Sequence, residues 1–280
     1  QIIEKADGLP LFIEELTNSV LSSMRNRSVD QAAAPDVQAA ELKVPDTLYD
    51  ALMERVDRVP QGRRLAQTAA VIGREFSYET LSFALPIGES DLRVTLARLE
   101  DADIIYRVGL SPQVLFAFKH ALLRDAIYSS LLRSSRRQMH ADIAAILEVH
   151  APEVAETQPE LLAHHHSESG NHGRAVDFWY QAGQRALAQS ANVEAIAHFR
   201  KALAGLASWP DTRDRASREI QLQLALGIPL IAVRGYAAEE TREVFARARA
   251  LCLQRNSPAE YFQALYGLWG HSWMGGKNDE

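Results

Sequence analysis

A small–large–small pattern recurs on successive predicted helices in the second half of the chain, and it limits the possible folds more than any other feature. The first copy is Ala175, Trp179 and Ala182, and the second is Ala195, Phe199 and Ala202. A spacing of i, i+4 and i+7 places three side chains on one helix face. The small residues let a neighbouring helix approach, and the aromatic ring fills the gap between the helices. The pattern predicts a stack of helix hairpins over residues 151–280, with a weaker third copy at Thr241, Phe245 and Ala248.

The segment 44–150 has a different organisation. Apolar residues at helical spacing predict helices over 48–59, 65–72, 78–85, 91–102, 120–132 and 135–150. Before the last two helices the period changes to two. Ile104 and Tyr106, followed by Phe116 and Phe118, flank a turn at 109–112 and predict a β-hairpin. Four helices, a hairpin and a further helix form the order expected of a winged-helix domain. The predicted fold class is therefore mainly α, with one small β-hairpin.

The first 43 residues contain two further segments. The sequence of residues 1–27 predicts a turn at Gly8 and Pro10 followed by an apolar helix. Proline at the first helical position is by itself an ordinary helix start. Residues 28–43 have no hydrophobic period and contain Pro35, so we interpret them as a linker.

Charge and cysteine content exclude several classes of protein. The net charge of −6 provides no overall basic field for nucleic acid or an anionic membrane. Cys252 is the single cysteine of the sequence, which excludes a disulfide framework and a cysteine-based zinc site and fits a reducing cytoplasm. No run approaches the ~20 apolar residues that span a bilayer. We therefore expect a cytoplasmic location and no membrane partner.

One part of the second half resembles the tetratricopeptide repeat. Trp179, Gly183, Ala195, Phe199 and Ala202 match its aromatic position, its glycine and the Ala-Phe-Ala of its second helix. Ala186 and Ala207 depart from it, since the family has tyrosine and a closing proline there. Helix starts predicted near 158 and 192 have the tetratricopeptide period. The resemblance implies an α-solenoid that binds a protein or a small ligand.

The order of the segments resembles the signal-transduction ATPases with numerous domains. Residues 8–16, Gly-Leu-Pro-Leu-Phe-Ile-Glu-Glu-Leu, are similar to a helix late in the ATPase module of that family. The stretches 44–48, 54–59, 69–76, 118–122, 126–128 and 137–140 are similar to the winged helix that follows it, and 235–239 and 267–269 to its repeats. The resemblance divides the chain into an ATPase remnant (1–27), a linker (28–43), a winged helix (44–150) and repeats (151–280).

The resemblance also implies a role. The chain would be a non-catalytic regulatory and interaction segment of a larger protein that binds ATP or ADP with Mg²⁺. Gly8 and Pro10 would lie near the nucleotide base, and the partners within the parent would be an ATPase core and an effector domain. In bacteria that effector is often a class III adenylate or guanylate cyclase. The alternatives are an ATP-dependent transcriptional regulator and a kinase–ATPase fusion.

Residues for catalysis or for a cofactor are not apparent in the sequence. Gly270 and Gly275 have the spacing of a phosphate loop, but Gly276 stands where lysine is required. The run His164–His166, with His172 nearby, could suggest a metal. Adjacent residues on a helix point about 100° apart, so at most two could share an ion. We favour a helix-contact role for His166 and expect no cofactor in this chain.

A basic cluster follows the predicted hairpin. Its members are Lys119, His120, Arg124, Arg133, Arg136 and Arg137. A solvated face is one interpretation, and a docking face for an acidic partner or the ATPase core is another. DNA is the less favoured partner, because the predicted recognition helix carries Arg93 and Arg98 among acidic residues and the hairpin adds only Arg107.

Overall fold

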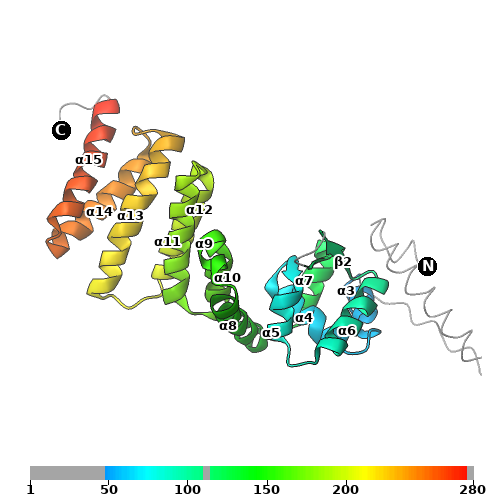
Figure 1. Ribbon diagram of the computed structural model, residues 1–280. Helices are drawn as coiled ribbons and strands as arrows, with labels where there is room; N and C mark the ends of the chain where they lie inside the picture. Colours follow the sequence, from blue (N-terminus) through cyan, green and yellow to red (C-terminus); the bar gives the residue numbers. More distant parts are fainter. Residues whose placement is uncertain (1–47, 110–113, 276–280) are drawn as a thin grey trace, which may run out of the picture. The chain divides into compact units, whose positions relative to one another are not determined.

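The computed structural model describes residues 48–109 and 114–275, which are mainly helical with one small antiparallel sheet (Figure 1). This confirms the predicted mixture of many helices with a minor β component. The chain forms two compact units, one ending at Met139 and the other beginning at His140. The predicted remnant with Gly8 and Pro10, the linker 28–43 and the turn residues 110–113 lie outside the described residues.

The first unit combines helices with a three-stranded sheet. Its helices are α3 (Leu48–Asp57), α4 (Gly62–Ile72), α5 (Tyr78–Ala84), α6 (Glu89–Asp101) and α7 (Ala121–Ser129), followed by the start of α8 (Arg133–His150). The strands are β1 (Glu75–Ser77), β2 (Ile105–Val108) and β3 (Leu115–Phe118), in the order β1-β3-β2. The unit boundary falls within α8, before the division at 150/151 that the sequence suggested.

The sheet contains the predicted hairpin and one unpredicted strand. β2 and β3 pair antiparallel, with Ile105 opposite Phe118. β1 pairs with the other edge of β3, so that Phe76 lies opposite Phe116. The rings of Phe76 and Phe116 stack with centroids 5.9 Å apart. A strand of three residues is too short to show alternation, and its partner lies far away in sequence, so β1 could not be recognised from periodicity.

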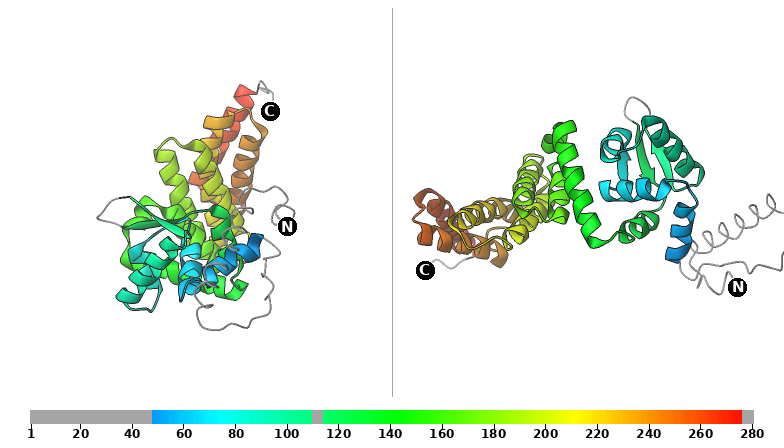
Figure 2. Two further views of the ribbon diagram at one scale, coloured as in Figure 1. Left: turned by 90° about the vertical axis from the view of Figure 1, so that its right-hand side faces the viewer. Right: turned by 90° about the horizontal axis from the view of Figure 1, so that it is seen from below.

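The second unit is built from helices that pack in sequence order (Figures 1 and 2). They are α9 (Glu153–Thr157), α10 (Pro159–Ser169), α11 (His172–Ala188), α12 (Asn192–Leu206), α13 (Arg213–Arg234), α14 (Glu239–Arg255) and α15 (Pro258–Met274). From α10 onward each helix contacts the next one along the chain. Side chains of Asn171 and Thr212 cap α11 and α13, which fixes where these helices begin.

The repeat positions singled out in the sequence lie in the core between α11 and α12. Ala195, Phe199 and Ala202 are fully buried, and Trp179 is nearly so. The Trp179 indole stacks on His198 of α12, and its N–H donates to Ser167 Oγ at 3.0 Å. The hydrogen bond satisfies the one polar group of the indole, so the ring can be buried without leaving an unpaired donor.

Glycines bring three helix pairs close together. A Cβ at Gly183 of α11 would lie 2.7 Å from Cδ1 of Phe199 on α12. Phe245 of α14 is approached from two sides, because a Cβ at Gly227 of α13 would lie 2.8 Å from its Cε1 and one at Gly267 of α15 would lie 2.5 Å from its Cδ1. Real side chains do not tolerate such distances, so each glycine is required by the position of the facing ring.

Arg55 joins α3 to the end of α6. Its Nε donates to the Ala102 carbonyl at 2.7 Å, and its Nη2 donates to the Asp103 carbonyl. We expect Arg55→Ala to lower the free energy of unfolding of the first unit by about 2 kcal/mol, because two carbonyls lose a charged donor. Hydrogen exchange of peptides covering residues 62–109 measures this. The matched control is Arg58→Ala, which removes a surface pair with Glu54 and should cost about 0.5 kcal/mol. Equal effects of the two substitutions would refute the assignment.

Candidate functional site

The predicted basic face separates into two parts. Lys119 Nζ lies 2.6 Å from Asp103 Oδ1, and this hydrogen-bonded pairing lowers the pKa of the Asp103 carboxyl against the opposing effect of burial. His120 is half-buried at the start of α7. The charge of Lys119 is therefore largely neutralised by Asp103, which weakens its attraction for an acidic partner.

The second part of the face is an arginine–tyrosine–arginine cluster. The guanidinium groups of Arg124 and Arg136 lie 5.0 and 4.8 Å from the centroid of the Tyr128 ring. Arg124 Nε also donates to the Ala70 carbonyl at 3.1 Å, which anchors α7 on α4. Arg133 and Arg137 are exposed on the first turns of α8. Arg124 Nη1 also pairs with Asp125 Oδ1 at 3.0 Å, so its charge is partly offset within α7. An acidic group from a partner would therefore meet mainly Arg136, which the Tyr128 ring helps to position.

Tyr128 was not among the predicted site residues. Its position four residues after Arg124 was the available signal, since residues at i and i+4 are neighbours on a helix surface. The contribution of Arg136 was not visible in this way, because Arg136 belongs to the next helix, α8, and only the fold brings its guanidinium over the Tyr128 ring.

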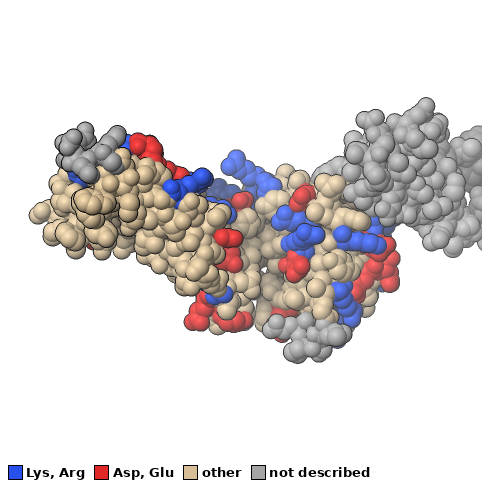
Figure 3. Space-filling view, turned by 90° about the horizontal axis from the view of Figure 1, so that it is seen from above, with Lys and Arg blue, Asp and Glu red and all other residues tan. Residues whose placement is uncertain are grey.

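Ion pairs limit the basic character of the sheet and of α6. Arg93 pairs with Glu89 at 2.6 Å, and Arg107 of the hairpin pairs with Glu100 at 2.9 Å. Figure 3 shows the consequence for the first unit, where lysine and arginine are interspersed with aspartate and glutamate on the visible face. A mixed surface of this kind is a poor match for a continuous row of phosphates.

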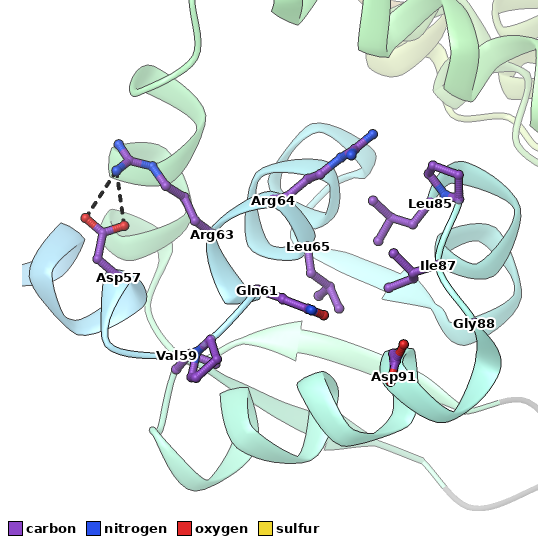
Figure 4. Close-up of a pocket in the computed structure, with 12 residues that line it drawn as sticks. Asp57, Val59, Gln61, Arg63, Arg64, Leu65, Leu85, Ile87, Gly88 and Asp91 are labelled. Atoms are coloured by element: carbon purple, nitrogen blue, oxygen red, sulfur yellow. Dashed lines mark hydrogen bonds and ion pairs between the residues drawn. The ribbon is translucent and has the colours of Figure 1, made fainter.

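A cavity of about 830 Å³ lies between α4 and the α5–α6 connection (Figure 4). Its lining is Asp57, Val59, Pro60, Gln61, Arg63, Arg64, Leu65, Leu85, Pro86, Ile87, Gly88 and Asp91. Gln61, Leu65 and Ile87 point into this space from different segments, whereas Arg63 turns to Asp57, 3.1 Å away. The backbone of Gln61 is left-handed, with φ 60°. The next position requires glycine, because a Cβ at Gly62 would lie 2.7 Å from Val59 Cβ.

The lining of this cavity combines apolar walls with an amide, two arginines and two carboxylates. Such a lining would suit a ligand or a partner side chain held mainly by burial. The lining contains no serine, cysteine or histidine, so it lacks the usual nucleophile–base pair. Sequence reasoning missed the cavity because its residues come from two stretches, 57–65 and 85–91, that only the fold brings together.

The histidine run contributes to packing between α8, α10 and α11. His166 Nε2 lies 2.9 Å from Glu148 Oε1, and its ring stacks on Phe178 with an interplanar angle of 3°. Burial would raise the pKa of Glu148, but hydrogen bonds from His166 and Arg174 outweigh this and lower it. Within the described residues no group of three ligands could hold a metal ion.

His165 forms a second, buried contact. Its Nδ1 lies 2.8 Å from Nδ1 of His140 on α8, and both side chains are fully buried. His165 Nε2 has no hydrogen-bond partner. An unpaired buried N–H is rarer than an unpaired acceptor, so we infer that His165 donates through Nδ1 and leaves Nε2 unprotonated.

The chain is 25% identical over 270 residues to an uncharacterised protein of Rhizobium meliloti (strain 1021). The alignment covers 94% of this chain, including parts of both units, and the chain spans about a quarter of the length of that relative. No protein-family profile matches the chain. In the described residues, no helix is long and apolar enough to cross a bilayer.

Proposed function

We propose that this chain is a non-catalytic regulatory and interaction segment of a multidomain ATP-dependent signalling protein that controls an adenylate or guanylate cyclase. The observation that carries the proposal is the order of the two units. A small helical unit with a three-stranded antiparallel sheet precedes a series of helices packed in sequence order. This order is consistent with a winged helix followed by tetratricopeptide-like repeats. The greater length of the Rhizobium relative supports a multidomain parent.

The two units would have different tasks. The first unit contacts the ATPase core through the cluster of Arg124, Tyr128 and Arg136, in which Arg136 receives an acidic side chain while Arg124 is paired with Asp125. The second unit binds a protein or a small ligand. Ligand binding changes the output only if the ligand binds the active and inactive arrangements of the parent with different affinities.

The test uses the parent protein with and without the whole second unit, residues 140–280. We expect the truncation to change both the affinity for a fluorescent ATP analogue and the production of cyclic nucleotide by about fivefold or more. A second variant, Arg136→Glu, tests the proposed contact within the complete parent. Its matched control is Arg249→Glu, which reverses an exposed charge on α14. Nucleotide binding and cyclase output that are the same in all four proteins would overturn the proposal.

A transcription regulator that reads DNA with the first unit is the alternative. Because Arg93, Arg107 and Lys119 are each paired with an acidic side chain, we expect no salt-dependent binding to duplex DNA near micromolar concentrations. Fluorescence anisotropy with labelled random and genomic duplexes at two salt concentrations measures it. Tight binding that weakens steeply with salt would favour the alternative.

A further inference from the structure

A second cavity, of about 570 Å³, lies in the second unit between α13, α14 and α15. Its lining consists of Leu224, Ile228, Ile231, Tyr236, Phe245, Phe262, Gln263, Tyr266 and Gly267. The three aliphatic side chains follow one face of α13, at i, i+4 and i+7. Four aromatic rings supply most of the remaining wall. The volume is within the range of sites for small molecules.

The floor of this cavity is rigid. Phe245 is only 6% exposed, and its ring is held between the backbones of Gly227 and Gly267. Any side chain at either glycine would displace the ring. The cavity therefore exists before a ligand arrives, which reduces the ordering cost of binding.

The turn that carries Tyr236 is fixed from two sides. Thr241 Oγ1 donates to the Gly235 carbonyl at 3.0 Å, and His271 Nδ1 lies 2.9 Å from the Tyr236 carbonyl. The Tyr236 ring covers Gly270, where a Cβ would lie 2.6 Å from Cε1 of the ring. These contacts hold one wall in place independently of any ligand.

The mouth of the cavity is apolar and uncharged. Ile228 is 58% exposed, Phe262 70% and Tyr266 58%. The nine lining residues include no aspartate, glutamate, lysine, arginine or histidine. Removing the exposed apolar area from water favours binding, whereas a charged ligand would lose hydration without gaining a partner.

We propose that this cavity binds an uncharged small molecule with a planar aromatic body, whose polar group hydrogen-bonds to the amide of Gln263. The exposed rings of Phe262 and Tyr266 supply stacking surfaces, and the buried ring of Phe245 closes the floor. The proposal deepens the sensor role proposed above by naming the ligand class, and it rests on that role for its regulatory meaning. The binding itself is a property of this chain.

The experiment titrates the whole chain with N-phenyl-1-naphthylamine, an uncharged probe whose fluorescence rises in apolar surroundings. We expect saturable binding of one probe per chain, displaced by indole. In methyl NMR spectra the signals of Leu224, Ile228 and Ile231 should shift, while those of Ile196 on α12 stay in place. This readout needs no variant, so it holds even if a substitution impairs folding.

Two matched variants locate the site. Ile228→Glu places a charge at the mouth and should weaken probe binding about tenfold or more. Leu253→Glu changes an apolar residue of α14 that is 59% exposed and does not line the cavity, and it should leave binding within about twofold. The proposal is overturned if probe binding does not saturate, or if both variants lose the same amount of probe affinity. It is also overturned if the probe is released as the chain dimerises, because a second copy of the chain would then occupy the cavity.

The outcome is separable from that of the proposed function. Probe binding without any response of the parent's cyclase output would leave the cavity in place and remove the sensor role. If the cyclase output depends on residues 140–280 but the probe does not bind, the regulatory role of the second unit would stand and the proposed cavity ligand would be rejected.

Discussion

Replacement of Gly183 by alanine is expected to lower the free energy of unfolding of the second unit by about 2 kcal/mol, although alanine is normally the better helix former by about 1 kcal/mol. The added Cβ would lie 2.7 Å from both Cδ1 and Cζ of Phe199. Phe199 is fully buried, so its ring cannot move aside without forcing α11 and α12 apart. All four tryptophans, of which Trp179 is the first, belong to the second unit, so denaturation followed by tryptophan fluorescence reports on it selectively.

The control lies on the same helix. A Cβ at Gly173 of α11 would meet its nearest neighbour at 3.9 Å, so Gly173→Ala should be neutral or slightly stabilising. Combining Gly183→Ala with Phe199→Leu tests the contact directly. The shorter leucine makes room for the Cβ, so the pair should cost less than the sum of the two single changes. Strict additivity, or equal effects at Gly173 and Gly183, would contradict the proposed contact.

Acidification is expected to destabilise the second unit through His165. Burial, and then the nearby charges of His140, His164 and His166, lower the pKa of His165 from 6.5 to about 3. Between pH 6.5 and about 3, His165 therefore stays unprotonated in the folded protein, whereas it binds a proton in the unfolded chain. The contribution of neutral His165 to the free energy of unfolding is fully present above pH 6.5 and is lost as the pH falls towards 3. The loss is about 1.4 kcal/mol per pH unit, or about 2 kcal/mol at pH 5.

The variant His165→Asn tests this. Asparagine keeps a polar group near the position of Nδ1 but has no proton to gain. It should lower stability at pH 7.5 and flatten the decline between pH 6.5 and 5, as measured by urea denaturation at each pH. The exposed His172 provides the control, and His172→Asn should follow the original profile. An NMR signal of His165 that titrates near pH 6.5 would show that the pair is accessible to protons in the folded state.

Periodicity was sufficient for the helices and the hairpin. The apolar spacing in α4, α11 and α12 and the alternation in β2 and β3 are local properties, and local preference and burial agree there. The strand β1 is different, because it exists only through pairing with β3, some forty positions along the chain. The chain also starts α8 at Arg133, slightly before the predicted start at 135.

The residues of the candidate sites could also be predicted only in part from the sequence. The basic residues of 119–137 could be collected from the sequence, but their partners could not. Lys119 is paired with Asp103, while Arg124 and Arg136 meet at Tyr128. The predicted nucleotide-base contacts at Gly8 and Pro10 lie outside the described residues and remain a prediction.

The sequence by itself determined that the chain is mainly helical, where the hairpin forms, and which face of α11 and α12 is buried, because these follow from the 3.6- and two-residue periods of a single segment. Only the tertiary structure decided that Gly227 and Gly267 both pack against Phe245, that His140 meets His165, and that two cavities are lined by residues from several elements each. Such contacts depend on which helix faces oppose one another and at what separation. That is set by the packing of all side chains together and leaves no mark in the period of any one segment.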